Sequence, residues 1–245
     1  DAIEFMCRKA NEVVVELESA VPSSPDFVDG AGVFEAIEGG GVWAVNEPDG
    51  TSTWLAVNDH PTDKAAWTFA ITAPDGFTAV ANGGFAGSSP GPDGTTWTWE
   101  QAEPMASYLV TLLIGPYELV DGGTSSTGVE LDHVVLADRA DTIDAYLDVT
   151  DEQLAFFEER FGPFPFDRYG LALADSIPGL AMETQGLSLF SATDLDGSLG
   201  ELQHLLLAHE LDIEGLARRR LDREDQPGQE RDHEHHPDLD DVGGD

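Results

Sequence analysis

Residues 178–190 read PGLAMETQGLSLF, and residues 201–211 read ELQHLLLAHEL. The apolar run in the second segment predicts a buried helix, and His209 and Glu210 stand near its end. This pair is the first half of a helical zinc motif, in which the histidine binds Zn²⁺ and the glutamate takes a proton from the metal-bound water. A second histidine is required one helical turn later on the same face. That position is Ile213, so the motif is half present.

The first segment carries a resemblance to a known family. Residues 179–185, GLAMETQ, followed by the helix that ends in His209-Glu210, resemble the aminopeptidase N family of zinc metallopeptidases, the gluzincin aminopeptidases. In that family a G-x-M-E-N-type strand lines the cleft, and its glutamate binds the free α-amino group of the substrate. The resemblance implies this role for Glu183, with Thr184 replacing the asparagine. It also implies that the strand aligns the peptide through Gly179, Ala181 and Met182.

A second carboxylate follows from the same resemblance. Residues 46–50, NEPDG, and residues 54–65, WLAVNDHPTDKA, are similar to the family's amino-terminal β domain, where a loop glutamate reaches the cleft. Glu47 takes this position. Two carboxylates that converge on one ammonium would select a free amino terminus and reject an internal peptide bond. The alternative is that Glu47 is a turn residue before Pro48.

A third match sets the domain organisation. Residues 156–169, FFEERFGPFPFDRY, are similar to the sequence segment with which the family's thermolysin-like catalytic domain begins. We therefore expect an amino-terminal β domain at 1–127, the first part of a thermolysin-like zinc peptidase domain at 128–211, and a disordered acidic tail at 212–245. The fold class is α+β: a β-rich saddle or sandwich, then the start of an α/β catalytic domain.

The local patterns predict mainly short strands. Turn signals such as Pro74-Asp75-Gly76 divide them, and their regular spacing favours a sandwich or saddle. A helix is expected over 138–161, where apolar residues recur at helical spacing and Gly162-Pro163 follows. The expected strands are Val13–Leu17, Trp54–Val57, Ala65–Thr72, Phe77–Ala81, Thr95–Gln101, Ser107–Ile114, Tyr117–Val120, Leu131–Leu136, Gly170–Ala174, Gly179–Gln185 and Leu187–Phe190.

The amino-acid composition limits which classes of partner the protein can bind. Acidic residues outnumber basic ones 48 to 11, giving a net charge of −37. This balance argues against nucleic acid and anionic lipid as partners, because neither would meet a basic patch. The single cysteine, Cys7, excludes an intramolecular disulfide. No apolar run is long enough to predict a membrane span. We expect a soluble protein and leave open whether it is cytoplasmic or secreted.

The resemblance implies a zinc-dependent aminopeptidase that removes amino-terminal residues from peptides with a free amino terminus. Zn²⁺ would be the cofactor, His209 a ligand, and Glu210 the general base and then general acid. The second histidine is missing, and the third ligand position is Asp232, in a stretch without apolar periodicity. We therefore expect a truncated and inactive fragment. Whether the tail after Leu211 is genuine or a frame change stays open, and the alternative function is a non-catalytic acidic β-rich binding module.

Overall fold

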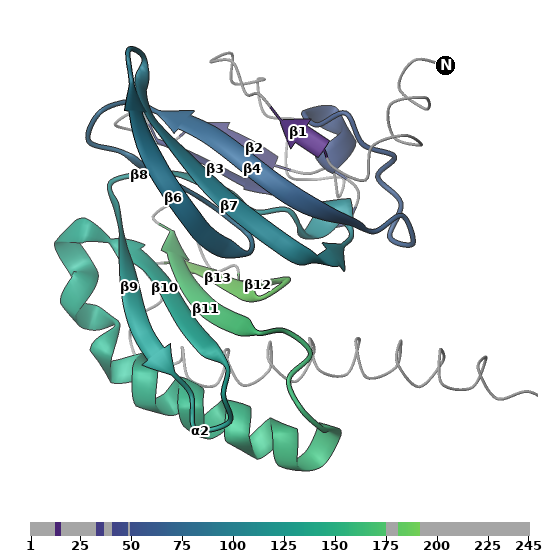
Figure 1. The fold of residues 1–245 in the computed structure, drawn as a ribbon, viewed down its shortest axis with the longest axis vertical. Helices are drawn as coiled ribbons and strands as arrows, with labels where there is room; N and C mark the ends of the chain where they lie inside the picture. Colours follow the sequence, from purple (N-terminus) through teal and green to yellow (C-terminus); the bar gives the residue numbers. More distant parts are fainter. Residues whose placement is uncertain (1–12, 16–32, 37–40, 49, 175–180, 192–245) are drawn as a thin grey trace, which may run out of the picture.

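The described part of the chain is mostly β-sheet with one long helix (Figure 1). The structure is a computed structural model, and it describes residues 13–15, 33–36, 41–48, 50–174 and 181–191. These residues form three sheets. The predicted α+β class is confirmed, with a β-rich part followed by a mixed sheet and a helix. No helix among these residues has the length and apolar character needed to cross a membrane.

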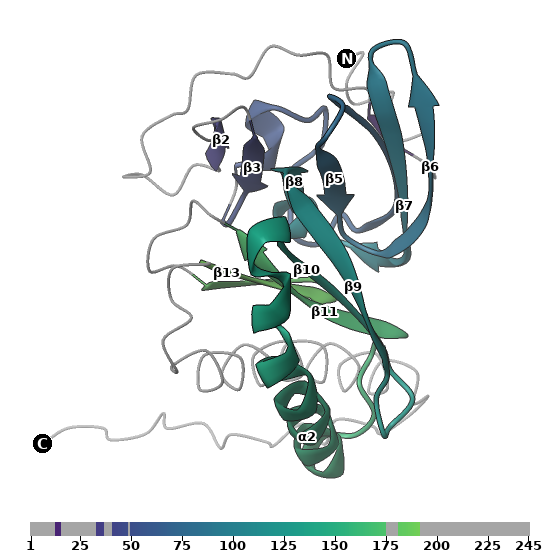
Figure 2. The same ribbon diagram turned by 90° about the vertical axis from the view of Figure 1, so that its left-hand side faces the viewer.

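The β-rich part contains two four-stranded sheets. One has the strand order β1-β4-β7-β6 and the other β2-β3-β8-β5, and Figure 2 shows β2, β3, β8 and β5 beside β7 and β6. Alternate residues of β4 are buried, which is the pattern of a strand with one face on a core. The strands are β1 (Val13–Val15), β2 (Val33–Ala36), β3 (Val42–Val45), β4 (Ala65–Ala73), β5 (Thr78–Ala81), β6 (Gly84–Gly91), β7 (Gly94–Met105) and β8 (Leu112–Gly115).

The third sheet has five strands in the order β12-β13-β11-β10-β9. β11 pairs in parallel with β10 and with β13, and the remaining pairs are antiparallel. Figure 1 shows the β-rich part above this sheet and helix α2 below it. The bounds are β9 (Tyr117–Thr124), β10 (Glu130–Leu136), α2 (Asp144–Phe161), β11 (Arg168–Ala174), β12 (Ala181–Thr184) and β13 (Leu187–Ser191).

Arg168 is one of the residues that join the two parts. Its guanidinium pairs with the carboxylates of Asp132 and Glu130 on the neighbouring strand β10. The same guanidinium packs against Gly84, where a Cβ would lie 3.0 Å from its central carbon. β9, which precedes residue 128, belongs to the five-stranded sheet. A domain boundary at about residue 128 stays a prediction.

Most of the predicted strands are confirmed, and the differences are local. Trp54–Val57 is not a strand, because the main chain turns there: Leu55 N donates to Thr51 O at 2.8 Å, after the 3-10 turn η2 (Thr51–Thr53). The first half of the strand predicted at Ser107–Ile114 is another 3-10 turn, η3 (Ser107–Leu109). Strands β2, β3 and β6 are not among the expected strands, since they lie in or beside stretches rich in glycine, serine or proline.

Candidate functional site

The loop that carries Glu47 follows strand β3 and is fixed by the residue before it. Asn46 is fully buried, and its Nδ2 donates to the main-chain oxygen of Val110 at 2.5 Å. Its Oδ1 accepts from the indole Nε1 of Trp54 at 2.6 Å, and its main-chain oxygen accepts from Gly50 N at 2.8 Å. Glu47 itself is exposed. The buried Asn46 makes three hydrogen bonds and therefore fixes the main chain next to the exposed Glu47.

Asp59 ties the same loop to the turn η3. Its carboxylate accepts from Ser52 N at 2.9 Å and from the Ser107 hydroxyl at 2.8 Å. The Thr51 hydroxyl donates to Ser107 O at 2.9 Å, which completes the connection. His60, next to Asp59, is an exposed turn residue whose Nδ1 accepts from Thr62 N at 3.3 Å. His60 therefore contributes to the turn.

Glu183 lies on β12, in the hairpin with β13. It stands opposite Ser188 in the ladder and is half-buried, as is Ala181, whereas Met182 is buried. Because side chains alternate along a strand, Ala181 and Glu183 share one face and Met182 lies on the other. In the described part β12 is the outermost strand of its sheet. Thr184 fixes the turn, because its hydroxyl donates to Leu187 O at 2.5 Å.

The turn after Glu183 is hydrogen-bonded to the β-rich part. Gln185 is buried, and its main-chain oxygen accepts from Asn82 Nδ2 at 3.3 Å. Its side-chain Nε2 donates to Glu103 O at 3.5 Å. Asn82 is also fully buried, and its Oδ1 accepts from Thr111 N at 2.7 Å. The segments of Glu47 and Glu183 are therefore connected by buried hydrogen bonds through Asn46, the Val110–Thr111 peptide, Asn82 and Gln185.

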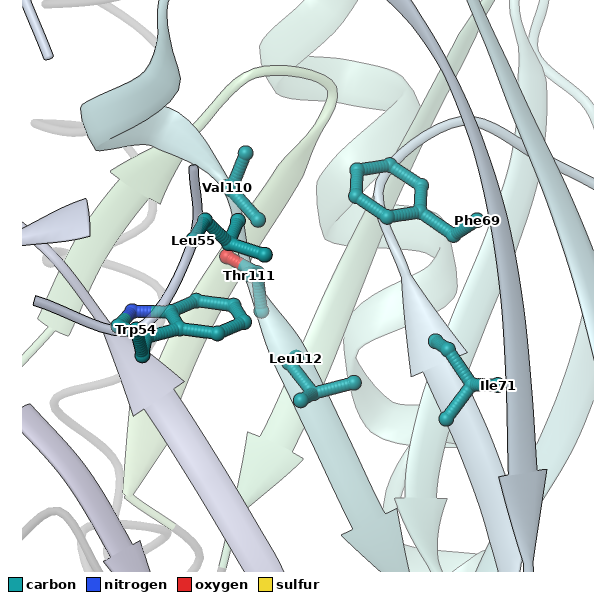
Figure 3. A pocket seen from close by; sticks show the side chains of 7 residues that line it. All are labelled: Trp54, Leu55, Phe69, Ile71, Val110, Thr111 and Leu112. Atoms are coloured by element: carbon teal, nitrogen blue, oxygen red, sulfur yellow. The ribbon is translucent and has the colours of Figure 1, made fainter. Parts of the chain in front are cut away.

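Two cavities lie near these residues, and neither matches the predicted site. The first is inside the β-rich part, where Phe69 and Ile71 from β4 face Trp54, Leu55 and the start of β8 (Figure 3). Its volume of about 10 Å³ corresponds to a single water molecule and excludes a peptide. The second, of about 240 Å³, lies between the two parts. Its lining is apolar apart from five side chains: Arg168, Asp132, Asp121, His133 and Tyr169.

Among the residues that the structure describes, His133 on β10 is a titratable group whose pKa is strongly lowered by burial. It is 1% exposed, and its Nδ1 accepts from Leu171 N at 3.1 Å. Burial penalises the charged imidazolium and lowers the pKa of His133 to about 4. Gly122 packs against the ring, since a Cβ there would lie 2.8 Å from Nε2. The imidazole is therefore neutral at pH 7 and serves the core of the sheet.

The predicted metal and catalytic residues fall outside the described residues. His209 and Glu210 lie there, and so does Gly179 of the predicted substrate-binding set. Among the residues that the structure describes, no three His, Cys, Asp or Glu side chains come together as a metal site would require. The structure therefore describes Glu47, Ala181, Met182 and Glu183 of the predicted site residues.

Comparison with curated proteins finds aminopeptidases. No family model matches the chain. It is 30% identical over 135 residues to the aminopeptidase N of Streptomyces lividans, covering 52% of this chain and 15% of that protein. It is 29% identical over 156 residues to human glutamyl aminopeptidase, covering 61% and 16%. It is also 29% identical over 140 residues to rat aminopeptidase B, covering 57% and 20%. The chain thus spans 15 to 20% of the length of these relatives.

Comparison with solved structures also finds zinc peptidases. An M1 zinc metallopeptidase from Deinococcus radiodurans superposes with a TM-score of 0.66 at 28% identity, over 78% of this chain and 43% of that one. The resemblance to the aminopeptidase N family is confirmed. A mutant of the same enzyme bound to a Tyr-Ser-Ala substrate superposes with a TM-score of 0.61 at 27% identity. Zinc is thus part of the aminopeptidase N-like structures that this chain resembles.

Sequence reasoning missed the residues that fix the aminopeptidase-like loop and strand. The sequence patterns assign no role to Asn46, Asn82 or Gln185. A signal is available for the two asparagines. Asn46 directly follows β3, and Asn82 directly follows β5, and both strands are apolar or β-branched. A buried amide needs a partner, so such a position predicts a hydrogen bond across the fold but not which residue accepts it.

Proposed function

We propose that this chain recognises the free amino terminus of a peptide through the carboxylates of Glu183 and Glu47. The single observation that carries the proposal is the match of the described fold to zinc aminopeptidases at 27 to 30% identity. The buried hydrogen bonds between the two carboxylate-bearing segments support it. In an aminopeptidase that hydrolyses peptides, these segments would form the subsite for the amino terminus of the substrate.

The chemistry favours an ammonium ligand. Hydrogen bonds between an ammonium and carboxylates are charge-assisted, and the positive charge of the ammonium offsets the repulsion between the two carboxylates. The surrounding chain is strongly acidic, with a net charge of −37, which raises the local concentration of cationic peptides. The outer position of β12 suits an extended peptide, which can pair with an edge strand along its main chain.

Zinc does not fit the residues that the structure describes, so no step is derived through it. The donor set is incomplete in the sequence as well, because Ile213 stands where a second histidine is needed. We expect the chain to hydrolyse aminoacyl anilides little or not at all. Zinc stoichiometry of the purified chain, beside a His209→Ala variant, checks this. One zinc per chain that is lost in the variant would contradict it.

The binding test is calorimetry of the purified chain with L-leucinamide and with N-acetyl-L-leucinamide. Acetylation removes the positive charge, so only the free amine is expected to bind. Glu183→Gln and Glu47→Gln should each weaken binding of L-leucinamide roughly tenfold, because each removes a charge-assisted hydrogen bond of about 1.5 kcal/mol.

Glu118→Gln is the matched control, since Glu118 is an exposed carboxylate on β9 and its loss should leave the affinity unchanged. Equal binding of the acetylated compound would sink the proposal. So would an affinity that neither Glu183→Gln nor Glu47→Gln changes.

A further inference from the structure

One peptide group lies between two buried asparagine side chains. Asn46 Nδ2 donates to the Val110 carbonyl, and the Thr111 N–H of the same peptide group donates to Asn82 Oδ1. The C=O and N–H of a planar trans peptide point in opposite directions, so the two asparagines lie on opposite sides of it. All four residues are at most 1% exposed. This peptide therefore acts as a rigid spacer between the asparagines.

The hydrogen bonds continue at both ends. The Trp54 indole donates to Asn46 Oδ1 at 2.6 Å, and Asn82 Nδ2 donates to Gln185 O at 3.3 Å. Every amide in the series accepts at one end and donates at the other, so each bond polarises the next in the low dielectric of the interior. We name this series the amide chain: Trp54, Asn46, the Val110–Thr111 peptide, Asn82 and Gln185.

The amide chain begins and ends beside the two carboxylates. Asn46 directly precedes Glu47, and Gln185 follows Glu183 by two residues. We propose that the amide chain sets the position of Glu47 relative to Glu183, with Asn46 and Asn82 as positioning residues. This inference rests on the proposed function of the two glutamates. Neither asparagine needs to contact the substrate, because each acts through the carboxylate that it positions.

Position 82 requires a side chain that can both donate and accept. It must accept from Thr111 N and donate to Gln185 O at the same time. An alanine leaves both groups buried without a partner, and an aspartate keeps the acceptor but loses the donor. A displacement of about 1 Å between groups that bind one ligand is enough to weaken a site markedly. We expect Asn82→Ala to weaken binding of L-leucinamide about tenfold although both carboxylates remain.

The direct test measures the distance between the two positions. In a Cys7→Ser background, Glu47→Cys and Glu183→Cys are spin-labelled, and the distance distribution is recorded by pulsed electron paramagnetic resonance. A single narrow distribution is expected when Asn82 is present. Asn82→Ala and Asn82→Asp should broaden or shift it. Thr72→Ala is the control, because it removes one exposed hydrogen bond on β4, to Thr96, and should leave the distribution narrow.

A second measurement approaches the amide chain from its other end. Asn46→Ala should shift the Thr111 amide proton resonance and speed its exchange, since both asparagines bind the same peptide group. This variant also replaces the Asn82 variants if they do not fold, as judged by circular dichroism. An unchanged distance distribution, or an unchanged Thr111 resonance, would overturn the inference.

The outcomes separate the two proposals. If the parent chain does not bind L-leucinamide, the proposed function fails, and the distance measurement still decides whether Asn82 positions the two residues. If binding is lost in Glu183→Gln but the labelled distance is the same with and without Asn82, the function stands and the positioning role fails.

Discussion

The loop that carries Glu47 and the strand that carries Glu183 are fixed by different kinds of hydrogen bond. Side chains fix the loop, through Asn46 and through Asp59 in the following turn. The main-chain ladder with β13 fixes the strand, whose own side chains contribute chiefly at the Thr184 turn. The loop therefore depends on a few specific residues, whereas the strand depends on a repeated backbone pattern that many sequences satisfy.

The comparison predicts different vulnerabilities. A strand should tolerate side-chain changes and fail when its backbone spacing is disturbed. A loop of this kind should fail when one buried amide is lost. The following changes probe the five-stranded sheet that contains β12 and the Glu47 loop, beginning with the largest expected effect.

Gly170→Ala should unfold the five-stranded sheet. A Cβ at this position would overlap the carbonyl oxygen of Asp132 on β10, so β10 and β11 would have to separate. We expect a loss of about 4 kcal/mol or more in the free energy of unfolding, measured by urea denaturation. Gly91→Ala is the control, because its Cβ would meet only Gly94 O at an ordinary 3.5 Å. Similar stability of the two variants would refute the importance of backbone spacing here.

The pH dependence of stability should report His133, which lies in the same sheet. Its pKa is about 4 in the folded chain and 6.5 when exposed, so the unfolded chain binds a proton first as the pH falls. The contribution of His133 to the free energy of unfolding is fully present above pH 6.5 and decreases between pH 6.5 and 4. The total loss from this group is about 3 kcal/mol.

Urea denaturation at several pH values measures this effect. His133→Asn retains an acceptor for Leu171 N and should remove this part of the slope. His60→Ala, at an exposed turn, should keep it. An identical slope in the parent chain and in His133→Asn would contradict the assignment.

Asn46→Ala should cost about 2 kcal/mol, because it leaves the buried Val110 carbonyl without its donor and removes the hydrogen bond that Asn46 accepts from the half-buried Trp54 indole. Thermal denaturation measures the loss. Thr72→Ala, which breaks an exposed hydrogen bond, should cost well under about 1 kcal/mol and serves as the matched control. If the two variants were equally stable, the loop would not depend on its buried amide.

The sequence predicted the regions where burial alternates along the chain. β4, β7 and β10 carry a period of two or an apolar run between turn signals, and the structure confirms them. β6, with the sequence GFAGSSPG, was missed because it is a largely exposed strand whose pairing with β7 leaves no apolar pattern. Trp54–Val57 was wrongly predicted as a strand, since its apolar residues pack under a turn that Asn46 fixes.

The candidate site was predictable only in part for a similar reason. Glu47 and Glu183 stand in short sequence motifs that resemble those of the aminopeptidase N family. Asn46 and Asn82 act through partners 64 and 103 residues away, and no local pattern specifies such a pairing. Arg168 is a comparable case, because its packing against Gly84 follows from the arrangement of the two parts and not from its own segment.

The amide chain also has a consequence for the order in which the fold is completed. Its members come from sequence positions so far apart that it closes only after both β5 and the β12–β13 hairpin are in place and docked. Loop-closure entropy makes such contacts among the last to form. The hydrogen bond from Asn82 to Gln185, which joins the two parts, should therefore be lost when they separate, even while each part stays folded.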